Sequence, residues 1–175
     1  MIPSRIYLVG MPGCGKTTLG KLLASRMAYH FVDLDELIAE QEQMSIADLF
    51  AQKGEPYFRE KEKEALHRTF KMTRTVVATG GGTPCFYDNM EQINKHGLAV
   101  FINIPLSIIA GRIERQQQQR PLLTAQSVED ILTQLKELYQ QRFPYYDQAE
   151  VAVSGTELNA DYIYNKIHQY ISANQ

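Results

Sequence analysis

The stretch IYLVGMPGCGKTTLGKLLA, residues 6–24, joins an apolar run to a glycine-rich turn and then to a second apolar run with a different period. Residues 6–9 are apolar and β-prone, as in a buried parallel strand, whereas the leucines after the turn recur at helical spacing. Between them, residues 10–17 read GMPGCGKT, which fits the pattern of two glycines that bracket four residues and precede Lys and Ser or Thr. The stretch therefore predicts a strand, a phosphate-binding loop (P-loop) and a helix.

The chemistry of this loop follows from its residue types. Glycines at positions 10, 13 and 15 let the backbone turn its N–H groups inward, and the next helix adds the positive end of its dipole. Lys16 is expected to face solvent in the empty loop and to reach the β- and γ-phosphates of a bound nucleotide, while the Thr17 hydroxyl ligates magnesium. A turn that binds nothing would not need Lys and Thr at these two positions.

Composition limits the class of protein. The chain of 175 residues, 44% hydrophobic and 22% charged, predicts a single domain over residues 1–175. A net charge of −2 and a pI near 6.1 make nucleic acid and anionic membranes unlikely partners by charge. The N-terminus does not resemble a signal peptide and no apolar run approaches the roughly 18 residues of a membrane span, so a cytoplasmic protein is expected.

Strand-like and helix-like patterns alternate along the chain without a linker or an internal repeat. Strands are expected at residues 6–9, 30–35, 74–82, 98–104 and 149–154. Because helices separate them, the strands should form a parallel sheet covered on both faces. In such a sheet the ligand site lies beyond the C-terminal ends of the strands.

Capping signals place several of the helices. Ser45 with Asp48 and Ser127 with Asp130 resemble capping boxes, and Asp88 with Glu91 is expected to open a third helix. Gly54 is expected to close the helix that begins after residue 45, with Pro56 in the first turn of the next one. Residue 142 is expected to end the helix that begins after residue 127.

Asp33 and Asp35, in the segment DLD, fall at the end of the second expected strand, where alternation places both side chains on one side of the sheet. Beside a bound triphosphate, one carboxylate can hold the water shell of magnesium and the other can accept a hydrogen bond from a substrate hydroxyl. The alternative is that Asp35 only caps a helix that starts at ELIAE. The position of the pair next to a P-loop favours the functional interpretation.

Three glycines, 80–82, follow the third expected strand. They leave a bare backbone that a ligand can approach and whose N–H groups can donate to it. The alternative is a flexible loop, which is less expected directly after a buried strand.

Three arginines complete the set of candidates. Guanidinium groups bind carboxylates and phosphates bidentately, so Arg59, Arg120 and Arg142 near a phosphate site would indicate two anionic ligands. Taken singly, Arg59 could form a surface pair with Glu55 or Glu62, and Arg142 could stabilise a helix C-terminus. Residues 115–123 are polar and rich in glutamine, which predicts a mobile lid that carries Arg120 to the transferring group.

The segments GMPGCGKT, DLDELI, FREKEKEAL, ATGGG, RPLL and QRFPYYDQAEV, in this order over nearly the whole chain, resemble the shikimate kinase family. The resemblance implies a three-layer α/β/α P-loop kinase of the nucleoside-monophosphate-kinase type with a five-stranded parallel sheet in the order 2-3-1-4-5. It implies an acceptor-binding region at residues 33–62, a lid at residues 113–124 and a monomer. It also implies transfer of the γ-phosphoryl group of ATP to the 3-hydroxyl of shikimate, with Mg²⁺, in chorismate and aromatic amino acid biosynthesis.

The resemblance also implies roles for individual residues. ATP would be bound by Gly13, Cys14, Gly15, Lys16, Thr17, Thr18, Arg112 and Arg120, with Arg112 against the adenine and Arg120 on the lid. Magnesium would be served by Thr17 and Asp33. Shikimate would be held by Asp35, Arg59, Gly81, Gly82 and Arg142. The catalytic residues would be Lys16, Asp35 and Arg120, with Asp35 orienting the acceptor hydroxyl.

Two departures from the family pattern and two other functions are relevant. Leu34 stands where the family more often has Thr or Ser, and the glutamine-rich lid replaces a more usual stretch with glycine and an acidic residue. A gluconate or nucleoside-monophosphate kinase of the same fold is the nearer alternative, although GGG and RFPYY would then have no evident purpose. A regulatory GTPase would need an Asn/Thr-Lys-x-Asp segment, which the sequence lacks.

Overall fold

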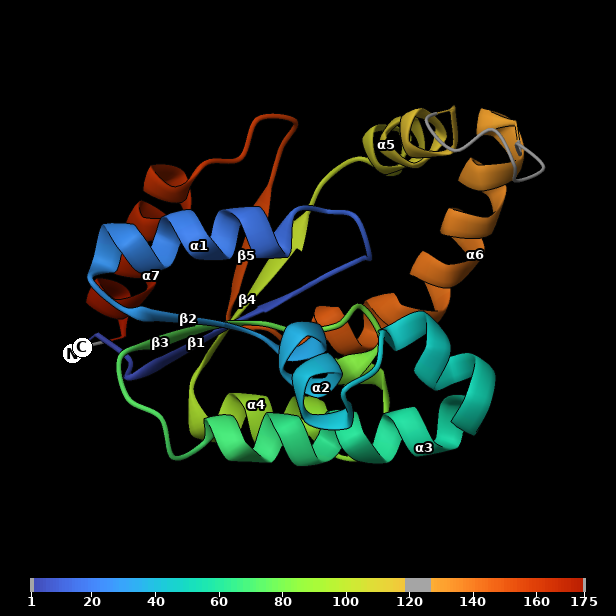
Figure 1. The fold of residues 1–175 in the computed structure, drawn as a ribbon. Helices are drawn as coiled ribbons and strands as arrows, with labels where there is room; N and C mark the ends of the chain where they lie inside the picture. Colours follow the sequence, from blue (N-terminus) through green and yellow to red (C-terminus); the bar gives the residue numbers. More distant parts are fainter. Residues whose placement is uncertain (1, 119–126, 175) are drawn as a thin grey trace.

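The computed structural model describes residues 2–118 and 127–174, and its centre is a five-stranded sheet. The strands are β1 (Arg5–Val9), β2 (His30–Asp33), β3 (Thr75–Ala78), β4 (Leu98–Asn103) and β5 (Val151–Ser154). They pair in parallel in the order β2-β3-β1-β4-β5 (Figure 1). The predicted fold class and strand order are confirmed.

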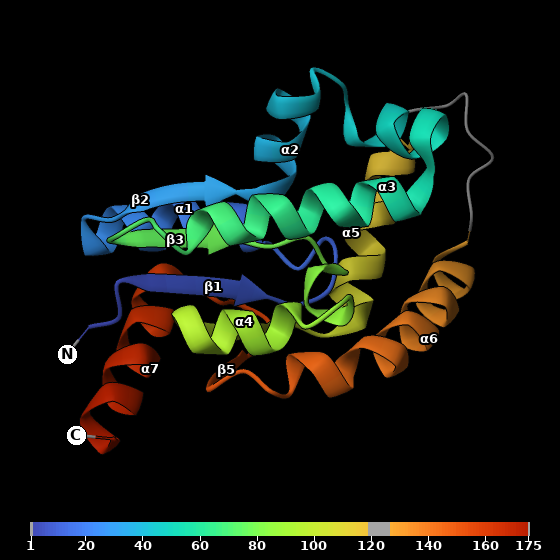
Figure 2. The ribbon, with the colours of Figure 1, turned by 90° about the horizontal axis from the view of Figure 1, so that it is seen from below.

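Helices cover both faces of this sheet, which gives three layers (Figures 1 and 2). Helices α1 (Lys16–Met27) and α7 (Ala160–Ala173) lie on one face, and α3 (Ile46–Thr69) and α4 (Asn89–His96) lie on the other. The remaining helices are α2 (Leu34–Glu42), the short 3₁₀ helix η1 (Thr83–Cys85), α5 (Leu106–Gln118) and α6 (Val128–Tyr146). Helices α5 and α6 contact each other at the side toward which the strand arrows point. Among the described helices, none has the length and apolar character that crossing a bilayer requires.

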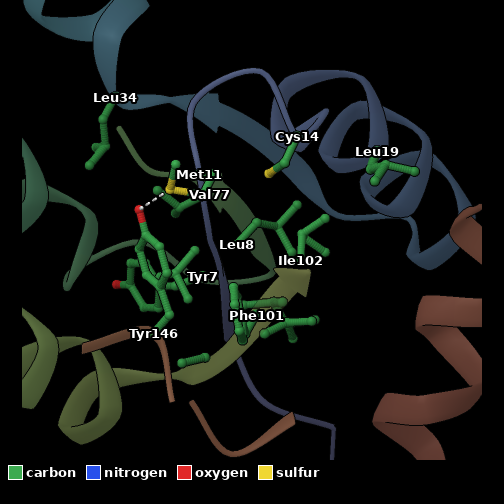
Figure 3. Close-up of a cluster of buried hydrophobic side chains, with 14 of the residues drawn as sticks. Tyr7, Leu8, Met11, Cys14, Leu19, Leu34, Val77, Phe101, Ile102 and Tyr146 are labelled. Atoms are coloured by element: carbon green, nitrogen blue, oxygen red, sulfur yellow. Dashed lines mark hydrogen bonds between the residues drawn. The ribbon is translucent and has the colours of Figure 1, made fainter. Parts of the chain in front are cut away.

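The core lies on both sides of the central strand β1, whose residues 6–9 are completely buried. Figure 3 shows Tyr7 and Leu8 of β1 among side chains from β3, β4, α1, α2 and α6. The ring of Tyr146 lies 5.2 Å from that of Phe101 and brings the end of α6 into this core. The two ring hydroxyls have partners there, because Tyr7 and Thr69 share a hydrogen bond of 2.9 Å and Tyr146 donates to Gly81.

Three strands end earlier than the sequence indicates. Strand β2 stops at Asp33, β3 at Ala78 and β4 at Asn103, whereas strands through residues 35, 82 and 104 are expected from the pattern. At β2 the reason is a helix cap: Asp33 Oδ1 accepts hydrogen bonds from the backbone N–H of Asp35 at 3.0 Å and of Glu36 at 3.4 Å. Asp33 is therefore the N-cap of α2, and Asp35 lies within the first turn of this helix.

The three expected helix starts are confirmed. The hydroxyls of Ser45 and Ser127 each accept from a backbone N–H three residues later at 3.1 Å. Asp88 is the N-cap residue of α4 but makes no side-chain cap hydrogen bond, and its carboxylate accepts from Gln92 Nε2 at 2.8 Å. Gly54, with a φ of 80°, interrupts α3 as expected.

Helix α6 continues four residues beyond the end that the sequence predicts. It passes through Pro144 and ends at Tyr146, whose side chain is completely buried. Proline removes one backbone hydrogen bond from the helix, but burial of a tyrosine ring outweighs this loss because it removes a large apolar surface from water. Arg142 therefore lies inside the helix, and the view that it serves a helix C-terminus is wrong.

Gly97, between α4 and β4, leaves room for the backbone of β1. A Cβ at this position would lie 2.7 Å from the carbonyl oxygen of Arg5 and 2.7 Å from the ring of Tyr7. Gly97→Ala is therefore expected to lower the free energy of unfolding by about 1 to 3 kcal/mol. Gly111→Ala is the matched control, because nothing lies within 4 Å of its Cβ and α5 should gain about 0.5 to 1 kcal/mol. Thermal or denaturant unfolding measures both, and a Gly97 variant as stable as wild type would contradict this view.

Candidate active site

A cleft of about 610 Å³ opens where the parallel strands end, as the sheet type predicts. The P-loop and the first turn of α1 form one wall, the aspartates of DLD and the start of the glycine segment form a second, and α5 with the loop after β5 forms a third. The lining residues are Pro12 to Leu19, Asp33, Asp35, Thr79, Gly80, Gly81, Ile104, Arg112 and Thr156 to Leu158.

The P-loop has the backbone that its glycines predict, since Gly10, Gly13 and Gly15 all have positive φ values. Lys16, however, does not face solvent as expected. Its side chain is only 7% exposed, and Nζ donates hydrogen bonds of 2.8 Å to the carbonyl oxygens of Gly10 and Met11. The ammonium group has three donors, and the inward-facing carbonyls of its own loop satisfy two of them. The carbonyl groups of the loop therefore hold the Lys16 ammonium group inside the loop.

Thr17 and Asp33 meet at the edge of this loop. The Thr17 hydroxyl donates to Asp33 Oδ2 at 2.6 Å, while Oδ1 of the same carboxylate caps α2. A hydroxyl and a carboxylate are oxygen donors of the kind that Mg²⁺ prefers, and Mg²⁺ usually keeps several waters, so few protein ligands suffice. The two residues fit the ion. Within residues 2–118 and 127–174 there is no cluster of three or more His, Cys, Asp or Glu residues that could hold a metal.

Asp35 has an unusual environment for a carboxylate. Its Oδ1 atom is buried and has no hydrogen-bond partner within the described part of the chain. Burial, and then the negative charges of Asp33 and Glu62, raise the pKa of Asp35 from 3.8 to about 6, although Lys16 and Arg59 oppose the shift. Such a group can accept a hydrogen bond, or a proton, from a ligand in the cleft.

Arg59 lies in a buried network rather than in a surface pair. Its Nη1 donates to Glu62 Oε2 at 2.8 Å, and Arg59 and Glu62 are 8% and 0% exposed. Glu62 Oε1 accepts from the Thr83 hydroxyl at 2.6 Å, and the guanidinium lies 3.9 Å from the centre of the Phe86 ring. Glu55, which is half exposed, accepts from Nε and Nη2 at 3.2 and 3.1 Å. Glu55, Glu62 and the Phe86 ring therefore fix the orientation of the Arg59 guanidinium group.

The three glycines provide space for these charged groups. A Cβ on Gly82 would lie 2.7 Å from both terminal nitrogens of Arg59, and a Cβ on Gly81 would lie 2.9 Å from Arg142 Nη1. A Cβ on Gly80 would lie 2.8 Å from Glu62 Oε1. None of the three glycines has a positive φ. The absence of side chains at these three positions is therefore a steric requirement.

Arg142 reaches the same segment from α6. Its side chain is half buried, and Nη1 is a buried donor without a hydrogen-bond partner among the described residues. A buried, unpaired N–H of a cation is costly, so this atom marks a place where an anion would be stabilised.

The structure brings most of the predicted residues together but not into one cavity. Arg59, Gly82 and Arg142 do not line the main cleft; they lie directly beyond it, in contact with the glycine segment. Arg112, on α5, donates to the carbonyl oxygen of Gly13 at 2.9 Å and lines the cleft. Arg120 lies outside the described residues, and residues 113–118 of the predicted lid form the end of α5.

Sequence reasoning missed two parts of the site. Residues 156–158, after β5, line the cleft, and their position at the C-terminal end of a parallel strand was the signal that could have found them. Glu62 was considered only as a surface partner of Arg59. Its neighbours Phe58, Ala65 and Leu66 are buried at helical spacing, which indicates that this face of α3 points inward.

A parallel sheet of this strand order, with a P-loop at its C-terminal edge, defines a P-loop kinase. A family model described as shikimate kinase matches residues 12–172. A shikimate kinase from Phocaeicola vulgatus is 42% identical over 155 residues, 89% of each chain, and one from Thermosynechococcus vestitus is 44% identical over 85% of this chain and 78% of its own. This chain belongs to the shikimate kinase family, and it is an enzyme, a kinase with ATP as its co-substrate.

Solved structures agree with this assignment. The crystal structure of shikimate kinase from Bacteroides thetaiotaomicron has a TM-score of 0.82 at 36% identity and covers 99% of this chain and 97% of its own. Shikimate kinase from Acinetobacter baumannii in complex with shikimate has a TM-score of 0.83 at 32% identity, with 100% and 96% covered. A gluconokinase from Sinorhizobium meliloti, at 15% identity and a TM-score of 0.53, shares the fold alone.

The raised pKa of Asp35 leads to a stability prediction. Between pH 4 and pH 6 the folded protein keeps a proton on Asp35 that the unfolded chain has lost, so stability falls as the pH rises through this range. Asp35→Asn is therefore expected to raise the free energy of unfolding at pH 8 by about 1 to 3 kcal/mol, with little effect near pH 4. Urea unfolding of both proteins at the two pH values measures this. A variant that is less stable than wild type at pH 8 would show that the ionised Asp35 carboxylate does not destabilise the folded protein.

Proposed function

We propose that this enzyme transfers the γ-phosphoryl group of ATP to the 3-hydroxyl of shikimate and so forms shikimate 3-phosphate and ADP. The observation that carries this proposal is a pair of buried atoms without partners, Arg142 Nη1 and Asp35 Oδ1, at neighbouring glycines of one loop beside a P-loop. The first suits a carboxylate and the second suits a hydroxyl. Shikimate carries both groups on one ring.

Acceptor binding divides into two chemical tasks. Arg59 and Arg142 would bind the carboxylate, because both guanidinium groups converge on the glycine segment. Asp35 and the backbone N–H groups of Gly81 and Gly82 would bind the hydroxyls. The acceptor ring can lie against residues 80–82 because no side chain projects from them.

ATP would occupy the main cleft. Its phosphates would accept hydrogen bonds from the N–H groups of residues 13–18, and Arg112 with residues 156–158 would lie at the base and ribose. Lys16 would exchange its contacts with the carbonyls of Gly10 and Met11 for contacts with the β- and γ-phosphates. Thr17 and Asp33 would hold Mg²⁺, which supplies charge neutralisation to the phosphates when it is bound.

The protein's contribution to the reaction is position and charge. The transition state of phosphoryl transfer is loose and asks for little covalent chemistry, so alignment of the acceptor hydroxyl with the γ-phosphorus dominates. Asp35 would orient this hydroxyl and take its proton late in the transfer. The lid role of Arg120 and the expectation of a cytoplasmic monomer without nucleic-acid or membrane partners stay predictions.

Removal of the P-loop lysine tests the nucleotide half of this proposal. Lys16→Ala is expected to reduce kcat by about 10² to 10³, because it removes charge compensation at the transferring group. It should also lower stability by about 1 to 3 kcal/mol, since the carbonyls of Gly10 and Met11 lose their partner. A coupled assay of ADP release and thermal unfolding measure the two effects. Activity close to that of wild type would remove Lys16 from the mechanism.

The carboxylate clamp is tested with Arg142→Lys, which keeps the charge but loses the planar fork. Binding of shikimate should weaken by about 10- to 150-fold, the value of a charge-assisted hydrogen bond, while KM for ATP stays unchanged. Shikimate methyl ester is the control ligand. The affinity of wild type should be lower for the ester than for shikimate by about the factor that Arg142→Lys loses for shikimate. The affinity of the variant for the ester should be only slightly lower than its affinity for shikimate. Equal phosphorylation of acid and ester by wild type would contradict the clamp.

A further inference from the structure

Tyr146 connects the two halves of the site through its hydroxyl. Its side chain is completely buried at the end of α6, and the hydroxyl donates to the carbonyl oxygen of Gly81 at 2.6 Å. The Tyr146 hydroxyl oxygen also lies 3.9 Å from Met11 Sδ, a contact drawn as a dashed line in Figure 3. Met11 also provides one of the two carbonyls that hold Lys16. One phenol thus contacts the acceptor segment and the P-loop.

The hydrogen bond to Gly81 fixes the orientation of a peptide that has few other restraints. The carbonyl of Gly80 accepts from Thr83 N–H at 3.2 Å and that of Gly82 accepts from Cys85 N–H at 2.9 Å, whereas the carbonyl between them is held by Tyr146. Neither residue 81 nor residue 82 has a Cβ, so their own side chains place no steric restriction on the shared peptide plane.

The N–H group of Gly82 belongs to this same peptide plane. No peptide bond in the described chain is cis, and in a planar trans peptide the C=O and the N–H point in opposite directions. A hydroxyl that fixes the Gly81 carbonyl therefore also fixes the direction of the Gly82 N–H. Within residues 2–118 and 127–174, the Gly82 N–H makes no hydrogen bond to a protein acceptor.

From this geometry we propose that Tyr146 is a positioning residue for the acceptor: its hydroxyl holds the Gly81–Gly82 peptide so that the Gly82 N–H donates to the acceptor ring substituents. This inference rests on the proposed function, because that function supplies the acceptor. Tyr146 itself does not line the cleft and acts through the glycine segment.

The hydroxyl is suited to this task because it stays a donor. Burial raises the pKa of the Tyr146 phenol far above its ordinary value, which outweighs the opposite effect of the nearby Arg142 charge. The group keeps its proton throughout the working pH range. The Gly81 carbonyl can accept but not donate, so the direction of the hydrogen bond is fixed.

Two phenylalanine variants test the inference. Tyr146→Phe removes only the hydroxyl and keeps the ring in the core. Tyr139→Phe is the matched control: it makes the same change on the same helix, where the hydroxyl donates to Asn103 Oδ1 at 3.4 Å and makes no hydrogen bond to the glycine segment within the described residues. For wild type and both variants, the measurements are KM and kcat for shikimate and ATP, the thermal midpoint, and the ¹H–¹⁵N amide resonance and hydrogen-exchange rate of Gly82 in the ligand-free protein.

Tyr146→Phe is expected to raise KM for shikimate about 3- to 10-fold, the value of a neutral hydrogen bond, and to leave KM for ATP within about twofold. Its Gly82 amide resonance should move and exchange faster, whereas Tyr139→Phe should match wild type in each kinetic and amide measurement. A Tyr146→Phe protein with an unchanged KM for shikimate and an unchanged Gly82 amide would overturn the inference. So would a parallel rise of both KM values with a lowered thermal midpoint, which would indicate a structural role alone.

The two proposals can fail separately. If wild type does not phosphorylate shikimate, the proposed function is wrong, and the acceptor role of Tyr146 falls with it even where the Gly82 amide responds to the hydroxyl. If wild type phosphorylates shikimate but Tyr146→Phe has the KM for shikimate and the Gly82 amide of wild type, the positioning inference alone is wrong.

Discussion

Two guanidinium groups fill the space that side chains at positions 81 and 82 would need, and the acceptor half of the site depends on this constraint. Arg59 can approach Gly82 only because Glu62 holds it from the other side, and Glu62 in turn holds Thr83 at the start of η1. Arg142 approaches Gly81 from α6, but its Nη1 has no such partner among the described residues. Residues of α3, α6 and η1 thus all meet at the glycine segment. Buried charged groups, and not apolar packing alone, hold this segment in place.

In the nucleotide half of the site, Lys16 and Asp33 also have hydrogen-bond partners within the protein. Lys16 is bound by the carbonyls of its own loop, and Asp33 divides its two oxygens between Thr17 and the start of α2. Asp35 and Arg142 each carry a buried atom without a partner, and the other such atoms in the described chain, on Asn89, Asn94 and His168, belong to residues that do not line the cleft. Buried polar atoms are rarely left unpaired in a native protein unless a ligand or function requires it.

The features that local pattern determines could be predicted from the sequence, and those that depend on tertiary packing could not. The P-loop and the caps at Ser45 and Ser127 belong to the first group, whereas the strand order is implied by the family resemblance and not by local pattern. The burial of Glu62, the closed position of Lys16 and the extension of α6 through Pro144 belong to the second, because each depends on contacts between distant segments. Spacing places Glu62 one turn after Arg59, but it does not say whether this face of α3 meets water or η1.

The ion pair between Arg59 and Glu55 makes the two arginines unequal toward an incoming anion. Glu55 Oε1 already occupies Nε and Nη2 of Arg59, and its side chain is 54% exposed. A carboxylate that takes this face replaces one anion by another, and the displaced Glu55 returns to water, so the number of ion pairs at Arg59 stays constant. At Arg142 an incoming carboxylate would meet a donor that has no partner among the described residues, and a new bond would form. In the proposed complex, binding would thus be an exchange at one arginine and an addition at the other.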